Sequence, residues 1–212
     1  MKCQSPPYTQ NFVNNDSPDN MCGQTPIIEF TTPVSSMCHN WTSDEMHANR
    51  RLVRFDKIQV GCRLIVSCEP IRQDEYCEND SVISCIYHEE TDTHVFTSVD
   101  VIFLLECLTG NLFPVDEKNR CRRNLEGLGP ETVSKNKPRM SPFFQRIMAM
   151  TRPMPRNIEK DIKVFPWDLL PQALVKILSK YVSHLDLELI IKLVDLISRC
   201  LIRRRIHTSL YL

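Results

Sequence analysis

The fold predicted for this chain is decided by residues 98–110, which read SVDVIFLLECLTG. Ser98 and Asp100 form a typical helix start, and Gly110 is a typical helix end. Between them the apolar residues fall on nearly every side of a helix, which is typical of a helix that is buried all round. We therefore predict a central apolar helix against which the rest of the domain packs.

Three runs before this helix have the two-residue alternation of β-strands. They cover residues 60–71, 81–87 and 93–96, with polar turns between them. Together with the helix they predict an α+β fold, in which a small antiparallel sheet of about three strands packs on the central apolar helix.

A short helix is predicted before these strands. Ser43 can cap it, two acidic residues follow in its first turn, and residues 46–55 continue it. Arg50, Arg51 and Arg54 fall near its C-terminal end, where the helix dipole favours cations. The dipole and a ligand role are both open as reasons for these arginines.

A mostly helical C-terminal half is predicted after the central helix. Helical spacing and capping residues indicate helices over residues 114–126 and 141–150, another ending near Tyr181, and a long amphipathic helix over residues 185–206. The predicted parts of the chain are a disordered tail at residues 1–42, the α+β domain at 43–182 and a C-terminal amphipathic helix at 183–212.

Composition limits the class of protein. Of the 212 residues, 42% are hydrophobic and 25% are charged, as in soluble globular proteins, whereas residues 1–42 are rich in Pro, Ser, Thr, Asn and Gln. The ten cysteines form no C-x-x-C pair and several lie in apolar runs, which favours buried free thiols in a reducing compartment. No apolar window of about 18 residues exists, so we expect no membrane span.

The formal net charge is zero, yet positive charge is concentrated in one part of the chain. Residues 115–163 hold twelve Lys and Arg against six Asp and Glu, whereas residues 46–114 hold six against eleven. Such polarity says more about binding partners than about the fold. It indicates an anionic partner for the middle of the chain.

The helix predicted at residues 114–126 can present arginines on one side. Cys121 lies on its narrow apolar face, while Arg120 and Arg123 point almost the opposite way. Acidic residues four positions from Arg120 and Arg122 could instead hold these side chains in surface ion pairs. Arg123 has no acidic residue at that spacing and is the strongest candidate for a phosphate contact.

The sequence shows no assembled catalytic or metal site. It has five glycines, no phosphate-binding loop and no G-x-S-x-G motif. Cys85, His88 and His94 could meet near a strand turn, but a structural zinc site needs four ligands and no fourth has a recognisable spacing. We expect neither an enzyme nor a cofactor.

Several motifs are long or unusual enough to be distinctive. They are RRLVRF at residues 50–55, SCIY at 84–87, TSVD at 97–100, EKNR at 117–120, RRNLEG at 122–127, TVSK at 132–135, PRNIEKD at 155–161 and KVFPW at 163–167. Together they resemble the conserved domain of the Medusa-type fungal developmental regulators over about residues 46–181. The resemblance implies a nuclear regulator of sporulation or morphogenesis genes that acts as a transcription factor.

The resemblance and the charge pattern together lead to one expected function. We expect a nuclear regulator of transcription in fungal development, in sporulation or meiosis, with the cytoplasm as a second location. The expected partner is DNA, whose backbone would be contacted through a basic face. The expected contact residues are Arg120, Arg122, Arg123, Lys135, Lys137, Arg139, Arg156, Lys160 and Lys163.

An alternative function needs no DNA. In this alternative the chain is a protein-interaction subunit of a regulatory complex, and its C-terminal helix binds a regulatory protein or a second copy of the chain. The residues expected to make that contact are Leu187, Ile190, Ile191, Val194, Ile197 and Leu201. No membrane partner is expected.

Overall fold

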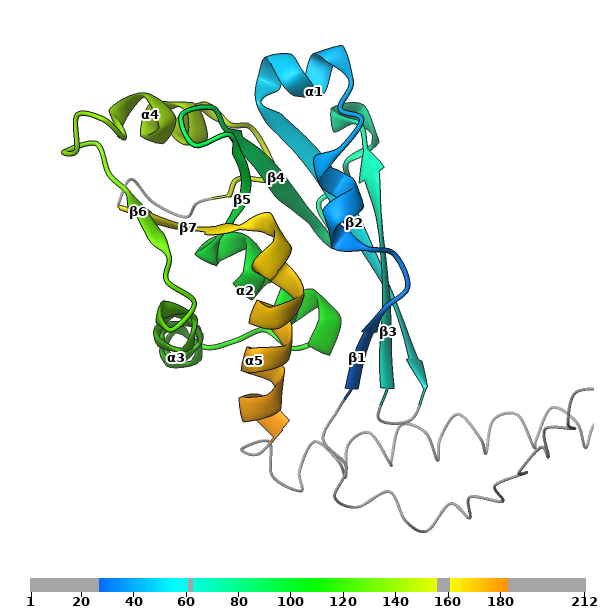
Figure 1. Cartoon of the computed structure of the whole chain (residues 1–212). Coiled ribbons are helices and arrows are strands. Elements are labelled where there is room, and N and C mark those ends of the chain that lie inside the picture. The colour runs from blue at the N-terminus through cyan, green and yellow to red at the C-terminus, as the bar shows by residue number, and fades with distance from the viewer. Residues whose placement is uncertain (1–26, 61–62, 156–160, 183–212) are drawn as a thin grey trace, which may run out of the picture.

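The computed structural model describes residues 27–60, 63–155 and 161–182 (Figure 1). The strands of this part are β1 (Ile27–Phe30), β2 (Arg50–Val60), β3 (Arg63–Ile71), β4 (Val82–His88), β5 (Thr93–Thr97), β6 (Glu131–Val133) and β7 (Ile162–Pro166). The α-helices are α1 (Ser43–Ala48), α2 (Ser98–Thr109), α3 (Val115–Glu126), α4 (Ser141–Ala149) and α5 (Leu170–Val182). Three 3-10 helices, η2 (Val34–Cys38), η3 (Gln73–Glu75) and η4 (Trp167–Leu169), complete the set.

The strands form a single mixed sheet of seven, in the order β1-β3-β2-β4-β5-β7-β6. β1 pairs in parallel with β3, and every other neighbouring pair is antiparallel. The prediction of a small antiparallel sheet of about three strands is therefore wrong. It missed four strands: β2, which was predicted as part of a helix, and β1, β6 and β7, which have four, three and five residues. Strands this short show no alternation of their own, and their partners lie elsewhere in the chain.

The helix predicted over residues 46–55 is also wrong beyond its first turns. Helix α1 ends at Ala48, and Asn49 adopts the left-handed conformation, with φ +50°, that commonly terminates helices. Strand β2 begins at the next residue. Arg50 and Arg51 are 7% and 4% exposed in that strand. Because buried positions are rarely arginine, these two residues conceal the strand pattern in the sequence.

The central helix is confirmed with its predicted ends. Thr97 caps α2 through reciprocal bonds with Asp100, and Gly110 ends it with φ +71°. Most of its side chains are buried, Leu104 and Leu105 completely. Two of them are acidic, however, because Asp100 and Glu106 are buried as well. The predictions of α3 and α4 are also confirmed, within a residue at each end.

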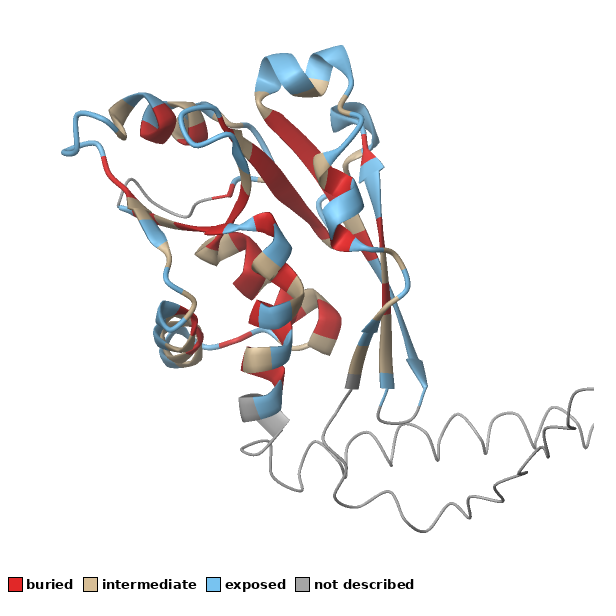
Figure 2. Ribbon diagram, viewed as in Figure 1, coloured by how far each residue is buried: buried red, intermediate tan, exposed pale blue. Residues whose placement is uncertain are grey.

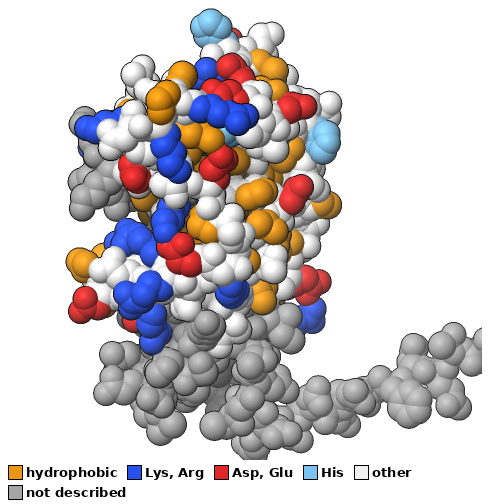
Figure 3. Space-filling view, turned by 60° about the vertical axis from the view of Figure 1, so that its left-hand side comes forward, with side chains coloured by type: hydrophobic (Ala, Val, Ile, Leu, Met, Phe, Trp, Pro, Cys, Tyr) orange, Lys and Arg blue, Asp and Glu red, His pale blue; other side chains and the backbone are white. Residues whose placement is uncertain are grey.

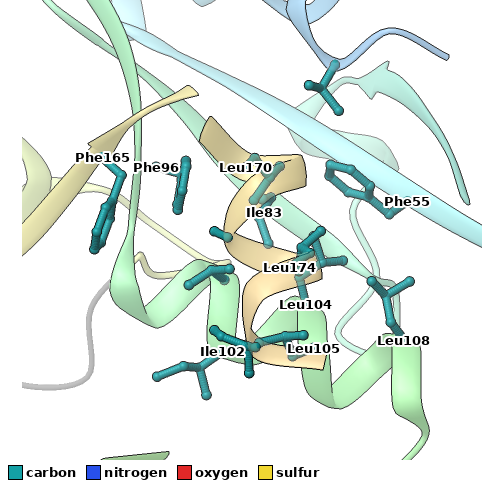
Figure 4. Close-up of a cluster of buried hydrophobic side chains, with 14 of the residues drawn as sticks. Phe55, Ile83, Phe96, Ile102, Leu104, Leu105, Leu108, Phe165, Leu170 and Leu174 are labelled. Carbon is teal, nitrogen blue, oxygen red and sulfur yellow. The ribbon is translucent and has the colours of Figure 1, made fainter. Parts of the chain in front are cut away.

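Two hydrophobic clusters lie on opposite faces of the sheet. Alternate residues of a strand point to opposite faces, and along β4 Ile83 belongs to one cluster and Ile86 to the other. The larger cluster joins the sheet to α2, α3 and α5, and Figure 4 shows Leu104 of α2 and Leu174 of α5 close to Ile83. Helix α4 covers the other face, where it contributes Phe143 and its apolar neighbours. Figure 2 shows the buried residues along the inner strands and helices.

Residues 27–42, which the sequence assigns to a disordered tail, are part of this fold. Here β1 extends the sheet, and η2 buries Val34 and Met37 in the larger cluster. Trp167, about 130 residues further on, donates a hydrogen bond from Nε1 to the Val34 carbonyl at 2.8 Å. The anchors of this segment are remote in sequence, so its local composition gave no sign of them.

The predicted C-terminal amphipathic helix at residues 183–212 lies outside the described residues. Among the helices of the described part, none has both the length and the apolar character needed to cross a membrane.

Candidate nucleic-acid interface

Helix α3 buries one side and exposes the other, as its sequence predicts. Cys121 and Leu125 lie in the larger hydrophobic cluster, and Arg123 is exposed. Arg120 forms an ion pair with Glu117, with Nε 2.8 Å from Oε1. The acidic partner therefore stands three residues away, where the sequence suggested one four residues away. Arg123 is the arginine of this helix that faces solvent most openly.

Lys118 and Arg122 flank the buried stripe of α3 but differ in their partners. The Lys118 ammonium lies 3.1 Å from Oε1 of Glu106, a buried carboxylate on α2. Arg122 donates from Nη1 to the side-chain oxygen of Asn119 at 2.8 Å. A neutral amide does not cancel the guanidinium charge, so Arg122 remains available to an anion.

Three basic segments of the chain meet around Thr132 on β6. Lys163 of β7 is paired with Thr132 in the sheet register, and the Lys137 ammonium donates to the Thr132 carbonyl at 3.3 Å. Lys163 also forms an ion pair with Glu126 at the end of α3. The structure thus brings α3, β7 and the loop at residues 134–140 to the same side of the molecule (Figure 1).

Acidic residues from another part of the sheet approach this side. Arg139 lies 3.7 Å from Glu90, and Arg146 of α4 lies 3.0 Å from Glu89. Both glutamates belong to the turn between β4 and β5. They reduce the positive charge that residues 115–163 carry by sequence alone, because this turn comes from the acidic part of the chain.

The expected contact residues divide into three groups. Arg120, Arg139 and Lys163 have acidic partners. Arg156 and Lys160 lie outside the described residues. Arg122, Arg123, Lys135 and Lys137 have no carboxylate within 4.0 Å in the part of the chain that the structure describes, and we call these four the basic face. Figure 3, which brings this side forward, shows Lys and Arg side chains interspersed with Asp and Glu.

Two buried arginines, for which the sequence left the role open, are structural. Arg50 donates from Nε to the Ser84 hydroxyl at 3.0 Å, from Nη1 to the Thr151 carbonyl at 2.9 Å and from Nη2 to the Pro153 carbonyl. Burial lowers the pKa of Arg50 to about 10, and the nearby Asp100 carboxylate opposes that shift. Arg50 thereby fixes the connector that follows α4.

Arg51 holds the segment before α1. It donates two hydrogen bonds to Glu45 and three to the carbonyls of Met37, His39 and Asn40. Neither the helix dipole nor a ligand accounts for these contacts, and both interpretations are set aside for this pair. The alternation of Val53 and Phe55 with Arg54 directly after them is the signal by which the sequence could have revealed a strand.

A cavity of about 430 Å³ lies beside α3. Its lining combines apolar side chains, such as Val99 and Phe103, with Arg122, Lys118 and Arg152. Lys118 is held by Glu106, and Arg152 forms an ion pair with Glu78. Arg122 is therefore the lining cation with no acidic partner in the described part of the chain, and it connects the cavity to the basic face.

The three residues considered for a zinc site each pack against different neighbours. His88 stacks on Phe143 with ring centroids 3.9 Å apart, and His94 packs edge-on to Trp41 at 4.9 Å. Cys85 is fully buried in the larger cluster. Within the described ranges no group of three His, Cys, Asp or Glu residues is placed to hold a metal ion. The residues of the alternative partner contact, Leu187 to Leu201, are outside those ranges.

Comparison with known proteins gives one match. The family described as a domain of unknown function (DUF7082) matches residues 24–178. No curated protein matches, and no solved structure matches.

Proposed function

We propose that this chain, which belongs to the family described as a domain of unknown function (DUF7082), is a nuclear regulator of transcription in fungal development. We propose further that it contacts the phosphate backbone of DNA through the basic face. The resemblance of its motifs to Medusa-type regulators supports the developmental role. The basic face, whose four cations have no acidic partner among the described residues, supports the contact with DNA.

The observation that carries the contact with DNA is the meeting of separate segments at Thr132. Lys137 of the loop and Lys163 of β7 both approach this residue, while Glu126 ties α3 to β7. Arg122 and Arg123 of α3 and Lys135 of the loop therefore project from elements whose relative position is fixed by the sheet. Rigid elements hold cations at set spacings, which favours a repeating anionic partner such as a nucleic-acid backbone.

The basic face is suited to affinity and positioning and not to base recognition. Lys and Arg contacts to phosphates release counterions and supply binding energy without reading sequence. Two of the four cations of the basic face, Arg122 and Arg123, lie on helix α3, and the other two lie on a loop. Any choice of DNA sequence would then come from residues other than these four, or from a partner protein.

A salt titration of duplex DNA binding tests the proposal. Binding of the full chain to a fluorescent duplex should weaken as salt is raised, and Arg123→Ala should reduce the slope of log affinity against log salt by about 0.9. Arg63→Ala is the matched control. Arg63 is exposed and pairs with Glu29, and its strand, β3, lies near the opposite edge of the sheet. Its slope should equal that of the wild type.

Two results would contradict the proposal. One is the absence of duplex binding at low salt by the folded wild-type chain. The other is an equal loss for Arg123→Ala and Arg63→Ala, which would show that only overall charge matters and that the basic face has no special part.

The ion pairs on this side favour one alternative function. Arg120, Arg139 and Lys163 are already matched by carboxylates, an arrangement that also suits a subunit with a protein partner. In that case the chain acts in a regulatory complex without touching DNA, through its C-terminal residues. Ending the chain after Val182 should then abolish recovery of the partner or of a second copy, and the full chain should show no duplex binding at low salt.

A further inference from the structure

Two cysteines far apart in the sequence lie side by side in the larger hydrophobic cluster. Cys38 ends η2 and is partly exposed, while Cys85 lies on β4 and is fully buried. Cys85 is part of the cluster and Cys38 packs against it, and each thiol is among the groups that shift the pKa of the other. Both are free thiols in the structure. Neither the basic face nor the cavity uses them.

Arg51 connects the strand that carries Cys85 to the segment that carries Cys38. In the pairing of β2 with β4, Arg51 stands directly opposite Cys85. Directly opposed residues of an antiparallel pair point to the same face of the sheet. The guanidinium then reaches the carbonyls of Met37 at 3.0 Å and His39 at 2.8 Å, the residues on either side of Cys38. The backbone around Cys38 is thus held over Cys85 by hydrogen bonds.

The two thiols differ in the way that a reactive pair requires. The hydrogen bond from Cys85 and the nearby Arg51 guanidinium lower the pKa of Cys38, against its partial burial and Asp168. Burial and the same hydrogen bond raise the pKa of Cys85 well above its usual value. A partly exposed thiol with thiolate character reacts with oxidants first, and a buried neighbouring thiol can then resolve the product.

We propose that Cys38 and Cys85 form an oxidation site at which hydrogen peroxide converts the two thiols into a disulfide. The Cys38 thiolate attacks one peroxide oxygen, the O–O bond breaks, and water leaves after protonation, so that Cys38 becomes a sulfenic acid. The Cys85 sulfur then attacks the Cys38 sulfur, and the sulfenic oxygen leaves as water with the Cys85 proton. The peroxide is reduced by two electrons, and the two thiols are oxidised by two.

The disulfide would fasten η2 to the middle of the sheet. Strand β4 lies fourth of seven in the sheet order, whereas η2 is held there by hydrogen bonds and packing. Oxidation should therefore restrain local opening of residues 31–42 and leave the rest of the domain as it is. The inference is independent of DNA binding and would survive the failure of that proposal.

Peptide mapping of the oxidised full chain tests the inference. The folded protein is treated with a small excess of hydrogen peroxide, the remaining thiols are alkylated, and the digest is analysed by mass spectrometry with and without dithiothreitol. We expect the Cys38 and Cys85 peptides to be joined, the loss of two alkylatable thiols per chain, and reversal by dithiothreitol. Limited proteolysis within residues 31–42 should slow in the oxidised protein.

Two variants make the test specific. Cys38→Ser should abolish the joined peptide, while Cys77→Ser should leave it unchanged, because Cys77 is an exposed cysteine outside the cluster. If Cys38→Ser fails to fold, the peptide map of the wild-type protein decides the test by itself. Oxidation of Cys77 while Cys38 and Cys85 both stay alkylatable would overturn the inference, and so would a Cys38 product that never joins to Cys85.

Discussion

Replacing Arg51 with alanine should lower the free energy of unfolding by about 3 to 4 kcal/mol. The Arg51 side chain is buried on β2 and donates two hydrogen bonds to Glu45, at 2.7 and 2.8 Å. Three more go to the carbonyls of Met37, His39 and Asn40, at 3.0, 2.8 and 2.8 Å. The substitution removes all of these donors at once and leaves their acceptors behind.

The size of the loss follows from the acceptors that remain. Removing one member of a buried ion pair costs about 3 to 5 kcal/mol, because the other charge stays buried without a partner. The Glu45 side chain is 16% exposed, so water can solvate part of its carboxylate and the lower half of that range applies. The contact of Arg51 with the Trp41 ring, 5.4 Å from its centroid, is lost as well.

Urea denaturation followed by circular dichroism measures this loss, with the free energy extrapolated to water. Arg54→Ala is the matched control, because Arg54 lies on the same strand but its ion pairs with Glu69 and Asp80 are solvated. Exposed ion pairs contribute little, so this control should stay close to the wild type. An equal effect of the two substitutions, or an Arg51→Ala protein as stable as the wild type, would refute the structural role of Arg51.

Three further predictions concern single residues. Burial raises the pKa of Asp100 to about 6, against about 3.9 in an unfolded chain. Its stabilisation is therefore full below about pH 4 and lost as the pH rises through about 6. The difference in unfolding free energy between wild type and Asp100→Asn should shift by about 2 kcal/mol from about pH 4 to about pH 7. Gly110→Ala should cost about 1 kcal/mol in denaturation because φ is +71°, whereas Gly127→Ala, at a right-handed position, should be close to neutral. Trp167→Phe should lower stability by about 2 kcal/mol, since it leaves the Val34 carbonyl without its donor; an unchanged thermal midpoint would contradict that role.

The parts of the fold that the sequence predicts are those whose signals are local. Helix α2 carries its own cap, its apolar residues and its terminal Gly110 within one stretch. Helix α3 likewise ends at Gly127 and repeats its apolar positions Cys121 and Leu125 one turn apart. Such features depend only on neighbours in the chain, so one sequence suffices to find them.

The parts that the sequence does not predict depend on distant partners. Strand β6 has three residues and exists because β7, about 30 residues later, pairs with it. Strand β1 depends on β3, and the segment after it depends on Trp167 and Arg51. A composition rich in Pro, Ser and Asn lowers the expectation of structure, but contacts supplied by another part of the chain can outweigh that local tendency.

The charge of the candidate site shows the same division between local and distant effects. Twelve Lys and Arg between residues 115 and 163 suggest a strong field, but Glu89 and Glu90 fold back onto Arg146 and Arg139. The basic face is what remains of that charge among the described residues. Four such cations can neutralise about four phosphates, which corresponds to a salt slope of about −3.6 for duplex DNA. A domain with so modest a slope binds DNA weakly by itself, so a regulator built on it needs a second source of affinity, from its own remaining residues or from a partner.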